Sequence, residues 1–364
     1  MGTRILVTGG AGFIGSTYTR MLLGPDGPDG PDGPDGPDGR EGPVGREGPV
    51  GREGPDGREG PDGIEVTVLD RLTYAGNRQN LAGLDDDPRL TFVRGDVCDV
   101  ELVESLAARH DQIVHLAAES HVDRSNESGT PFVTTNTLGT QTLLEAAVRH
   151  GIETFVHVST DEVYGSISSG SWTEDAPLAP TTLYAASKAS SDLLALAHHR
   201  THGLDVRITR CSNNYGPRQF PEKIVPLFIT RLLNGHTVPL YGDGSQVREW
   251  LHVDDHCRGI ELVRTRGRAG RVYNLGSGVE LTNRELTALL LEACGAPPDR
   301  VRHVADRKGH DARYSVDWSR ARDELGYVPL GDLRKGLAET VRWYRESEHA
   351  SGLPAPAVGN VPPS

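Results

Sequence analysis

Cysteine, methionine and aromatic residues are scarce in this chain of 364 residues, and the scarcity of cysteine excludes two classes of site. The four cysteines lie far apart and form no CxxC pair, so neither a disulfide framework nor a zinc site is expected. No stretch of about eighteen apolar residues and no apolar leader occurs, which argues against membrane insertion and secretion. We therefore expect a cytoplasmic protein. The cysteines are Cys98, Cys211, Cys257 and Cys294.

An excess of positive charge is also missing, which argues against nucleic-acid binding. The formal net charge at pH 7 is −13, and more than half of it comes from residues 24–63. This segment consists of Gly-X-Y triplets that contain eleven acidic residues and four arginines, and it therefore carries a net charge of −7. The remainder is an ordinary, mildly acidic chain that is long enough to build a sizeable core.

The Gly-X-Y repeat resembles collagen in composition, but its position argues against a collagen module. Its Y positions contain no proline to stiffen a triple helix. The flanking segments TRILVTGGAGFIGSTYTRMLL and IEVTVLDRLTYAGN are typical of one small α/β unit, and a flexible coil can close the gap between them at a modest entropy cost. We interpret residues 24–63 as a disordered, solvated loop inserted between the first helix and the second strand, and as a neutral expansion.

Short runs rich in valine and isoleucine alternate with helix-length segments over residues 1–211, which is typical of a doubly wound parallel sheet. Beyond this point the alternation fades, so residues 212–350 are expected to form mainly a smaller α/β lobe that binds the substrate. A flexible tail is expected over residues 351–364. The expected strands cover residues 4–9, 66–70, 90–96, 112–118, 154–160 and 205–210, and two of the expected helices cover residues 131–149 and 184–201.

The segment ILVTGGAGFIGS, at the end of the first expected strand, contains a dinucleotide-binding pattern. Gly10, Gly12 and Gly15 have the GxGxxG spacing, and Gly9 with the last two also gives GxxGxxG. Glycine lets the backbone turn tightly and approach a pyrophosphate at a helix N-terminus. A purely structural glycine-rich turn is the alternative interpretation.

The second expected strand ends in Asp70, where a carboxylate can accept hydrogen bonds from a ribose 2′-hydroxyl and repel a 2′-phosphate. This acid lies farther from the glycines than usual, and removal of residues 24–63 restores the normal spacing. The combination predicts a Rossmann domain that binds NAD in preference to NADP.

Two further patterns are candidates for chemistry. The segment YAASKAS places Tyr184 and Lys188 four residues apart on one helix face, where the cation is expected to lower the pKa of the phenol toward that of a general base. The segment STDEVYG places Thr160, Asp161 and Glu162 at the end of the fifth expected strand, in the crevice where the cofactor is expected. One of the two acids could stay protonated while the other is ionised.

Eight segments together resemble the nucleotide-sugar 4,6-dehydratases of the extended short-chain dehydrogenase family. They are GGAGFIGS, LDRLTYAGN, HLAAESHVDRS, STDEVYG, YAASKASSD, CSNNYGPRQFPEKIVP, YGDGSQVREWLHVDDH and RKGHDARYSVD. The Thr-Asp-Glu trio is the most specific element, because relatives that epimerise or decarboxylate lack it. The resemblance implies an NAD-dependent lyase of deoxysugar biosynthesis that acts on dTDP-glucose. No metal is expected, because the nicotinamide carries the redox chemistry.

The resemblance also implies roles for the catalytic candidates. Tyr184, assisted by Thr160 and Lys188, would remove the proton of the 4-hydroxyl while hydride leaves C4 for NAD⁺. Glu162 would then take the C5 proton and Asp161 would protonate the departing C6 hydroxyl, before hydride returns to C6.

Residues that line the two ligands are implied in the same way. Besides the glycines and Asp70, the cofactor would contact Phe13, Ile14, Thr73, Asp96, Val97, Leu116, Ala117, Thr135 and Asn214. The sugar nucleotide would contact Ser120, Asn213, Lys223, Ile224, Arg248, Asn274, Arg307 and His310. The cations in this set suit a diphosphate. Lys308 departs from the family pattern, in which proline is familiar, and leaves the geometry of its loop open.

Three alternatives remain open at this point. The chain could be a nucleotide-sugar 4-epimerase, a dehydratase for UDP- or CDP-glucose, or a non-enzymatic NAD-binding scaffold with a collagen-like arm. The resemblance further implies a homodimer in which the helices at 131–149 and 184–201 form a four-helix bundle.

Overall fold

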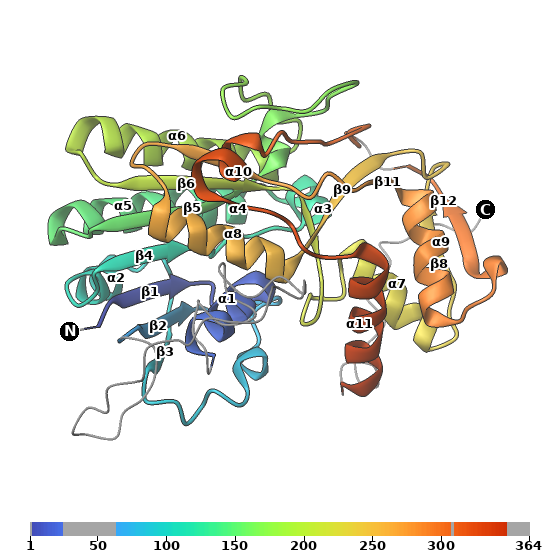
Figure 1. Ribbon diagram of the computed structural model, residues 1–364, viewed down its shortest axis with the longest axis horizontal. Coiled ribbons are helices and arrows are strands. Elements are labelled where there is room, and N and C mark those ends of the chain that lie inside the picture. The colour runs from blue at the N-terminus through green and yellow to red at the C-terminus, as the bar shows by residue number, and fades with distance from the viewer. Residues whose placement is uncertain (1, 25–62, 307–308, 348–364) are drawn as a thin grey trace, which may run out of the picture.

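A parallel seven-stranded sheet covered by helices on both faces dominates the molecule, and two smaller sheets lie beside it (Figure 1). The computed structural model describes residues 2–24, 63–306 and 309–347. The strand order β10-β6-β5-β4-β1-β2-β3 reverses the direction of winding between β1 and β4, which is where a doubly wound sheet binds its ligand. The strands are β1 (Arg4–Thr8), β2 (Glu65–Asp70), β3 (Leu90–Arg94), β4 (Gln112–His115), β5 (Thr154–Thr160), β6 (Val206–Cys211) and β10 (Val272–Leu275).

All six expected strands belong to this sheet, so the predicted doubly wound sheet is confirmed. The seventh strand, β10, was not predicted. It lies beyond residue 211 and pairs in parallel with β6, beginning with Val272 opposite Ile208. The chain does leave the large sheet after β6, but it returns to it, so the expected boundary at residue 211 is not the edge of this sheet. The division into two lobes stays a prediction.

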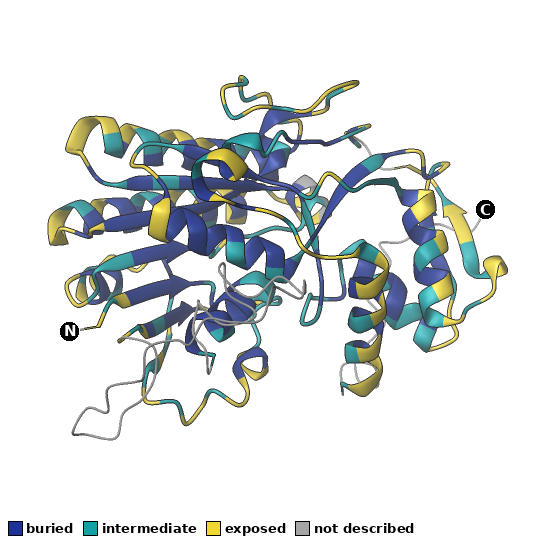
Figure 2. Ribbon diagram, in the orientation of Figure 1, coloured by how far each residue is buried: buried dark blue, intermediate teal, exposed yellow. Residues whose placement is uncertain are grey.

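Alternate residues of the central strands point to opposite faces of the sheet, and each face has its own core. Ile5 and Val7 pack on the face covered by α1 (Phe13–Leu23) and α8 (Val253–Arg266), whereas Leu6 packs on the other face. Because both faces are buried, the strands read as nearly continuous apolar runs, and the exposed residues gather on the outer helices (Figure 2). The second face is covered by α2 (Val100–Ala107), α5 (Gly139–His150) and α6 (Leu183–His202).

The two helices expected at residues 131–149 and 184–201 are present. The second is α6, and the first consists of the short α4 (Thr130–Phe132), a π-helical turn η3 (Val133–Leu138) and α5. None of the helices in the described part of the chain is long and apolar enough to cross a membrane.

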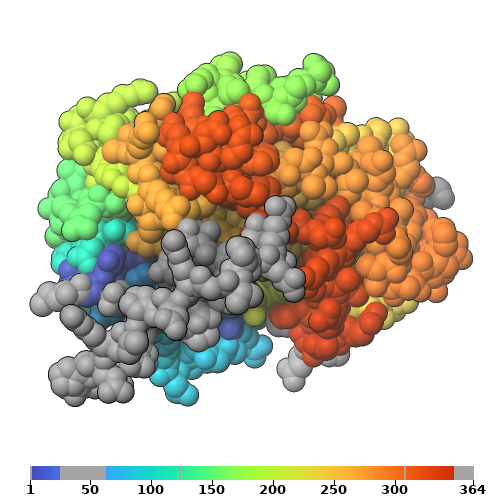
Figure 3. Space-filling view, viewed as in Figure 1, coloured from blue at the N-terminus to red at the C-terminus, as the bar shows by residue number. Residues whose placement is uncertain are grey.

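The smaller part contains a mixed three-stranded sheet and a parallel pair of strands, which confirms a C-terminal α/β region. The core of the smaller part lies among helices α7, α9 and α11. Helix α10 instead packs on α8 and β10 of the large sheet. The C-terminal segment, red in Figure 3, therefore contacts both parts. The strands are β7 (Asn213–Tyr215), β8 (Val238–Tyr241), β9 (Val247–His252), β11 (Glu280–Thr282) and β12 (Val301–Val304); the helices are α7 (Ile224–Leu233), α9 (Asn283–Cys294), α10 (Ser319–Leu325) and α11 (Leu333–Glu346). The short helices are η2 (Arg78–Leu81), α3 (Val122–Glu127), η4 (Asp161–Tyr164) and η5 (Pro298–Arg300).

A regular β1-α1-β2 unit forms across the position of the Gly-X-Y repeat. Strands β1 and β2 pair in parallel from Arg4 opposite Glu65 to Thr8 opposite Leu69. Helix α1 ends at Leu23, and β2 begins at the edge of the sheet where the strands start. The prediction that the repeat interrupts one domain is therefore confirmed. The prediction of a solvated coil falls on residues 25–62, which lie outside the described residues.

Candidate active site

The glycine-rich loop joins β1 to α1, and its glycines serve different purposes. Gly9 has a φ of 71°, and a Cβ on Gly15 would lie 2.2 Å from the carbonyl oxygen of Gly9, so both positions require glycine for the turn itself. A Cβ on Gly12 would meet only that carbonyl oxygen, at 3.2 Å, among the described residues. Gly12 is also the N-cap of α1 and provides no side-chain cap. The first N–H groups of α1 can therefore bind an anion, and the loop fits a pyrophosphate.

Asp70 ends β2 and supports the glycine-rich loop from beside it. Its Oδ2 accepts a hydrogen bond of 2.9 Å from the N–H of Ala11, and its Oδ1 accepts one of 2.8 Å from the N–H of Leu72. Burial raises the pKa of Asp70, while these two backbone bonds lower it. The carboxylate thus braces the loop and lies at the carboxyl end of β2, where a ribose hydroxyl is expected.

The other residues expected around the cofactor follow the carboxyl ends of neighbouring strands. The N–H groups of Leu116 and Ala117, after β4, donate to the backbone oxygen and the Oγ1 of Thr8, at 3.1 and 3.3 Å. Asp96, after β3, accepts a hydrogen bond of 3.0 Å from the N–H of Cys98. The remaining positions are Phe13 and Ile14 at the start of α1, Thr73 after β2, the buried Val97 after β3, Thr135 in η3 and Asn214 in β7.

The Thr-Asp-Glu trio begins at the last residue of β5 and continues into η4. Thr160 Oγ1 accepts a hydrogen bond of 3.2 Å from the N–H of Glu162 and donates one of 3.2 Å to Asp161 Oδ1. Asp161 is 3% exposed, and its Oδ2 has no hydrogen-bond partner among the described residues. Burial raises the pKa of Asp161 well above its ordinary value, and the charges of Glu162 and Glu249 raise it further. The trio therefore combines a carboxyl group that holds its proton with an acid beside it.

Tyr184 lies in the first turn of α6, whose N-cap Thr182 accepts a hydrogen bond of 3.1 Å from the N–H of Ala185. The sequence predicted a lowered pKa for Tyr184, and the structure shows the opposite. Burial raises the pKa of this phenol well above 10, the charge of Glu162 adds to the effect, and a hydrogen bond with Thr160 opposes it. Lys188 is also buried, so its pKa falls to about 8, and its Nζ donates a hydrogen bond of 2.8 Å to the carbonyl oxygen of Val158.

Two of the cations expected to bind the sugar nucleotide lie between the two parts of the molecule. Lys223, just before α7, donates a hydrogen bond of 2.6 Å from Nζ to the backbone oxygen of Ser120, after β4. Arg248 in β9 is 5% exposed, and its guanidinium lies 4.3 Å from the centre of the Tyr314 ring. The positive charge of Arg248 lowers the pKa of Asp161, which places it close to the trio.

The remaining substrate candidates are spread around this region. Ile224 opens α7, and Asn213 opens β7 with a side-chain oxygen that has no hydrogen-bond partner among the described residues. His310 Nδ1 lies 2.7 Å from an oxygen of Asp306. Arg307, together with the departure at Lys308, lies outside the described residues.

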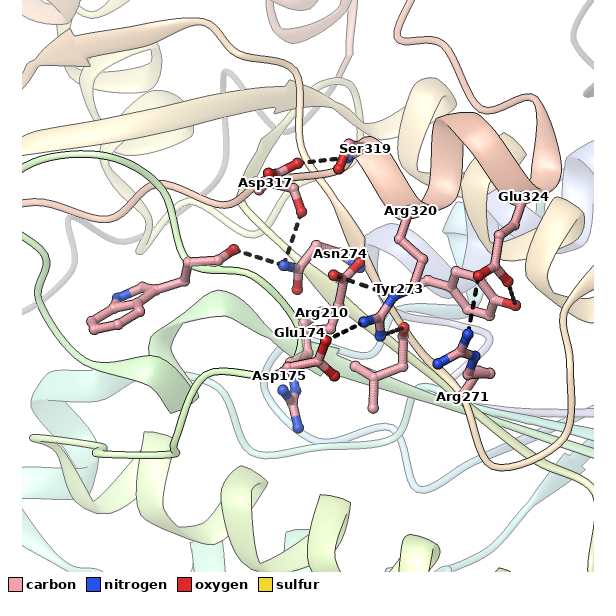
Figure 4. Close-up of polar contacts among 12 residues, drawn as sticks. Glu174, Asp175, Arg210, Arg271, Tyr273, Asn274, Asp317, Ser319, Arg320 and Glu324 are labelled. Atoms are coloured by element: carbon pink, nitrogen blue, oxygen red, sulfur yellow. Dashed lines mark hydrogen bonds and ion pairs between the residues drawn. The ribbon is translucent and has the colours of Figure 1, made fainter.

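Asn274 differs from the other substrate candidates, because both ends of its amide bond to protein groups. It is fully buried in β10, and its Nδ2 donates to the backbone oxygens of Trp172 at 2.9 Å and Asp317 at 3.1 Å (Figure 4). Its Oδ1 accepts a hydrogen bond of 2.8 Å from the hydroxyl of Tyr164. Asn274 therefore links three loops, and its contact with the sugar nucleotide stays a prediction.

Sequence reasoning missed a layer of buried polar residues behind Lys188. Asp192 on α6 and Arg210 on β6 form an ion pair of 2.8 Å, and their side chains are 0% and 3% exposed. Asn136 Nδ2 donates to the backbone oxygen of Glu119 and to Ser187 Oγ, at 3.0 and 2.8 Å, and so ties η3 to α6. The available signal was the helical period, because a residue four positions after Lys188 lies on the same face of the helix.

Comparisons with known proteins agree with this geometry. Residues 61–340 match the family model described as GDP-mannose 4,6 dehydratase. The chain is 60% identical over 346 residues to a dTDP-glucose 4,6-dehydratase of Streptomyces griseus, and the match covers 95% of each chain. A crystal structure of dTDP-glucose 4,6-dehydratase from Streptomyces venezuelae with NAD bound is 57% identical and has a TM-score of 0.85, covering 95% of this chain and 98% of that one. UDP-glucose 4-epimerase from Thermotoga maritima is more distant, at 29% identity and a TM-score of 0.79 over 94% and 99% of the two chains.

Proposed function

We propose, for a chain that belongs to the GDP-mannose 4,6-dehydratase family, that it converts dTDP-glucose to dTDP-4-keto-6-deoxyglucose with NAD as cofactor. The observation that carries the proposal is the trio at the end of β5, in which the buried Asp161 lies between Thr160 and Glu162 and close to Tyr184. A dehydratase needs a proton donor for the departing hydroxyl in addition to a base, and a buried carboxyl group with a raised pKa supplies it.

The cofactor site is formed by the loop after β1 and the ends of the strands beside it. Gly9, Gly12 and Gly15 shape the loop, the uncapped start of α1 faces the pyrophosphate, and Asp70 binds the ribose. NAD supplies the hydride acceptor for C4 and returns the hydride to C6. The side chains and backbone groups proposed to line it are those of Phe13, Ile14, Thr73, Asp96, Val97, Leu116, Ala117, Thr135 and Asn214.

Oxidation at C4 requires removal of a hydroxyl proton, and this step is assigned to Tyr184. Thr160 supports the phenolate through its hydrogen bond with Tyr184, and Lys188 contributes a positive charge from the same face of α6. The low polarity that raises the pKa of Tyr184 also makes its anion a strong base once it forms.

Elimination of water follows, because a ketone at C4 acidifies the C5–H bond. Glu162 takes this proton, and Asp161 protonates the C6 hydroxyl as it leaves. The geometry supports this division of roles. Asp161 is almost fully buried, which favours its protonated form, whereas Glu162 is only partly buried. When hydride returns to C6, Glu162 gives its proton to C5. Tyr184 then loses the proton that it took from the 4-hydroxyl, and Asp161 regains a proton in place of the one that left with water, which restores the starting state.

The sugar nucleotide is proposed to lie between the end of β5 and the smaller part of the molecule. Arg248 and Lys223 are placed there to balance the charge of a diphosphate, and Arg offers two parallel donors. The further residues proposed to contact it are Ser120, Asn213, Ile224, Arg307 and His310. Asn274 belongs to the same proposed set.

The proposal is tested by incubating purified protein with dTDP-glucose and measuring a ketone that absorbs in base. The expected product has lost the C6 hydroxyl, and mass spectrometry checks this loss. Parallel reactions with UDP-glucose and CDP-glucose check the nucleotide, and turnover is expected to be fastest with dTDP-glucose. A 4-epimer that keeps its C6 hydroxyl would contradict the proposal in favour of an epimerase, and no product with any of the sugars would favour a non-enzymatic NAD-binding scaffold.

A cytoplasmic homodimer is also part of this proposal. The helical segment from α4 to α5 and helix α6 expose apolar side chains that are between 52% and 59% exposed, which suits a bundle between two copies. These side chains are Val133, Leu138, Leu183 and Leu193. Size-exclusion chromatography with light scattering is expected to give twice the mass of one chain, and charged substitutions at Val133 and Leu193 are expected to give monomers.

A further inference from the structure

Asp192 is an ionised carboxylate in the interior of the protein. Burial by itself raises the pKa of this group, but the charge of Arg210 and hydrogen bonds bring the pKa down to about 2. Arg210 Nε donates to Asp192 Oδ2 at 2.8 Å. A buried ion pair is weak evidence for stability, because taking both charges out of water costs much of what their attraction contributes. The pair therefore calls for another explanation than stability.

Lys188 and Asp192 lie one helical turn apart on α6 and approach the same short stretch of β5. Lys188 Nζ donates to the carbonyl oxygen of Val158, and Asp192 Oδ1 lies 3.4 Å from His157 Nε2. The negative charge of Asp192 raises the pKa of Lys188, against burial, which lowers it. Asp192 thus provides a fixed negative charge behind Lys188, the proposed catalytic cation.

Arg210 in turn connects this pair to the trio. Its Nη1 donates a hydrogen bond of 2.8 Å to the hydroxyl of Tyr164, and its guanidinium lies 4.8 Å from the centre of the Tyr164 ring. Tyr164 is the last residue of η4, the turn that contains Asp161 and Glu162. Tyr164 also donates a hydrogen bond of 2.8 Å from its hydroxyl to Asn274 Oδ1 on β10. One continuous buried chain of contacts therefore joins helix α6 to the turn that carries the acids.

Other titratable groups face Lys188 from three strands, but they carry no charge near neutral pH. Burial lowers the pKa of His157 on β5 to about 4 and that of His115 on β4 well below its usual value. Burial raises the pKa of the Cys211 thiol on β6. Asp192, whose charge is partly balanced by Arg210, is consequently the anion that raises the pKa of Lys188.

We propose that Asp192 is a positioning residue, which keeps Lys188 protonated and oriented toward Tyr184 while Arg210 and Tyr164 lock it to the trio. This inference rests on the proposed dehydratase function. It adds a residue that touches no substrate and acts only through Lys188. Because a nearby charge shifts a pKa by one unit or more, loss of Asp192 moves the titration of Lys188 to lower pH.

The experiment compares the pH dependence of kcat for wild-type protein and Asp192→Asn, with dTDP-glucose as substrate. The alkaline limb of the profile is expected to move to lower pH by about one unit in the variant, which corresponds to a roughly tenfold loss of kcat above that limb. KM for dTDP-glucose and the content of bound NAD are expected to stay unchanged. The conservative Asp192→Glu variant is expected to restore most of the wild-type profile.

Asp205→Asn is the matched control, because Asp205 pairs with Arg207 on the same strand as Arg210 but lies at the far end of that strand. Its profile is expected to coincide with that of the wild type. Should Asp192→Asn fold poorly, the double variant Asp192→Asn with Arg210→Met removes both buried charges. Its alkaline limb is expected to move in the same direction but by less, because the positive charge of Arg210 is lost as well.

An unshifted alkaline limb in a folded variant would overturn the inference, and so would a loss of kcat that is equal at every pH. These results differ from a failure of the proposed function, because in that case the wild-type protein itself forms no 4-keto-6-deoxy sugar.

Discussion

Two aspartates of this protein are buried to nearly the same degree, but one is neutral and the other is ionised. Asp161 is 3% exposed, and its pKa is raised because burial and the neighbouring acids disfavour the anion. Asp192 is 0% exposed, yet its pKa is about 2, because Arg210 is in contact with it. Burial alone therefore does not decide the charge of an interior carboxyl group, and the partner within hydrogen-bond distance does.

The difference separates two tasks within one site. A carboxyl group that keeps its proton near neutral pH can act as an acid, whereas a permanently ionised one can only hold or orient a cation. Asp161 lies beside Thr160 at the carboxyl end of β5, and Asp192 lies behind Lys188 in the interior. The following variants test this contrast, beginning with the largest expected effect.

Glu162→Gln tests the acid that shares the trio with Asp161. Because the amide cannot accept the C5 proton, kcat is expected to fall by roughly 10²–10⁴-fold. NAD is expected to remain bound, since Glu162 makes no part of the glycine-rich loop. The measurement is ketone formation together with the NAD content of the purified variant, and unchanged turnover would remove Glu162 from the mechanism.

Asp192→Asn is expected to destabilise the protein by about 3–5 kcal/mol, because it leaves the buried charge of Arg210 without its anion. The pKa of Asp192 is lowered on folding, so its contribution to stability is present above the unfolded pKa of about 3.9 and is lost as the pH falls through about 2. The difference in Tm from the wild type, measured by thermal denaturation, is therefore expected to be large at pH 7 and to shrink in acid. A variant with an unchanged Tm at pH 7 would contradict the assigned charge state.

Asp161→Asn is expected to have the opposite sign and a smaller size. The pKa of Asp161 is raised on folding, so the wild type loses stability as the pH rises from about 3.9 toward the folded pKa, and the neutral amide does not. We expect Tm to rise by roughly 2–4 °C at pH 7.5 and to match the wild type near pH 4, while turnover is lost. A decrease of Tm at pH 7.5 would show that Asp161 is ionised in the folded protein.

Asp205→Asn is expected to have the smallest effect. It measures how much stability is lost when a partly exposed ion pair, and not a buried one, is removed. Asp205 and Arg207 are 2.6 Å apart, but their side chains are 25% and 12% exposed. The expected loss is less than about 1 kcal/mol. A loss as large as that of Asp192→Asn would mean that proximity to arginine, and not burial, makes the interior pair special.

The large sheet could be predicted from sequence because its strands are buried on both faces and read as apolar runs of usual length. Strand β10 was missed since VYNL is only four residues long and follows a region of weak alternation. Its position is determined by pairing with β6, which is a contact between distant parts of the chain. Such a contact leaves no local pattern in the sequence.

The residues of the candidate site could be proposed from the sequence, but their burial and their pKa values could not. The spacing of Tyr184 and Lys188 gave their common helix face, but it gave no information on how deeply both are buried, and burial reverses the expected pKa of Tyr184. Asp192 resembles a solvated residue in the string KASSDLL, and Arg210 resembles the end of an ordinary strand. Only the packing of α6 against β6 shows that they meet.

The uninterrupted pairing of β1 with β2 has a practical consequence for protein engineering. The register from Arg4 opposite Glu65 is kept although some forty residues separate the helix end at Leu23 from the strand start. That junction lies at the edge of the sheet remote from the glycine-rich loop and the trio. It therefore offers a grafting position for a tag, a fluorophore or a second domain whose two attachment points lie away from the glycine-rich loop and the trio.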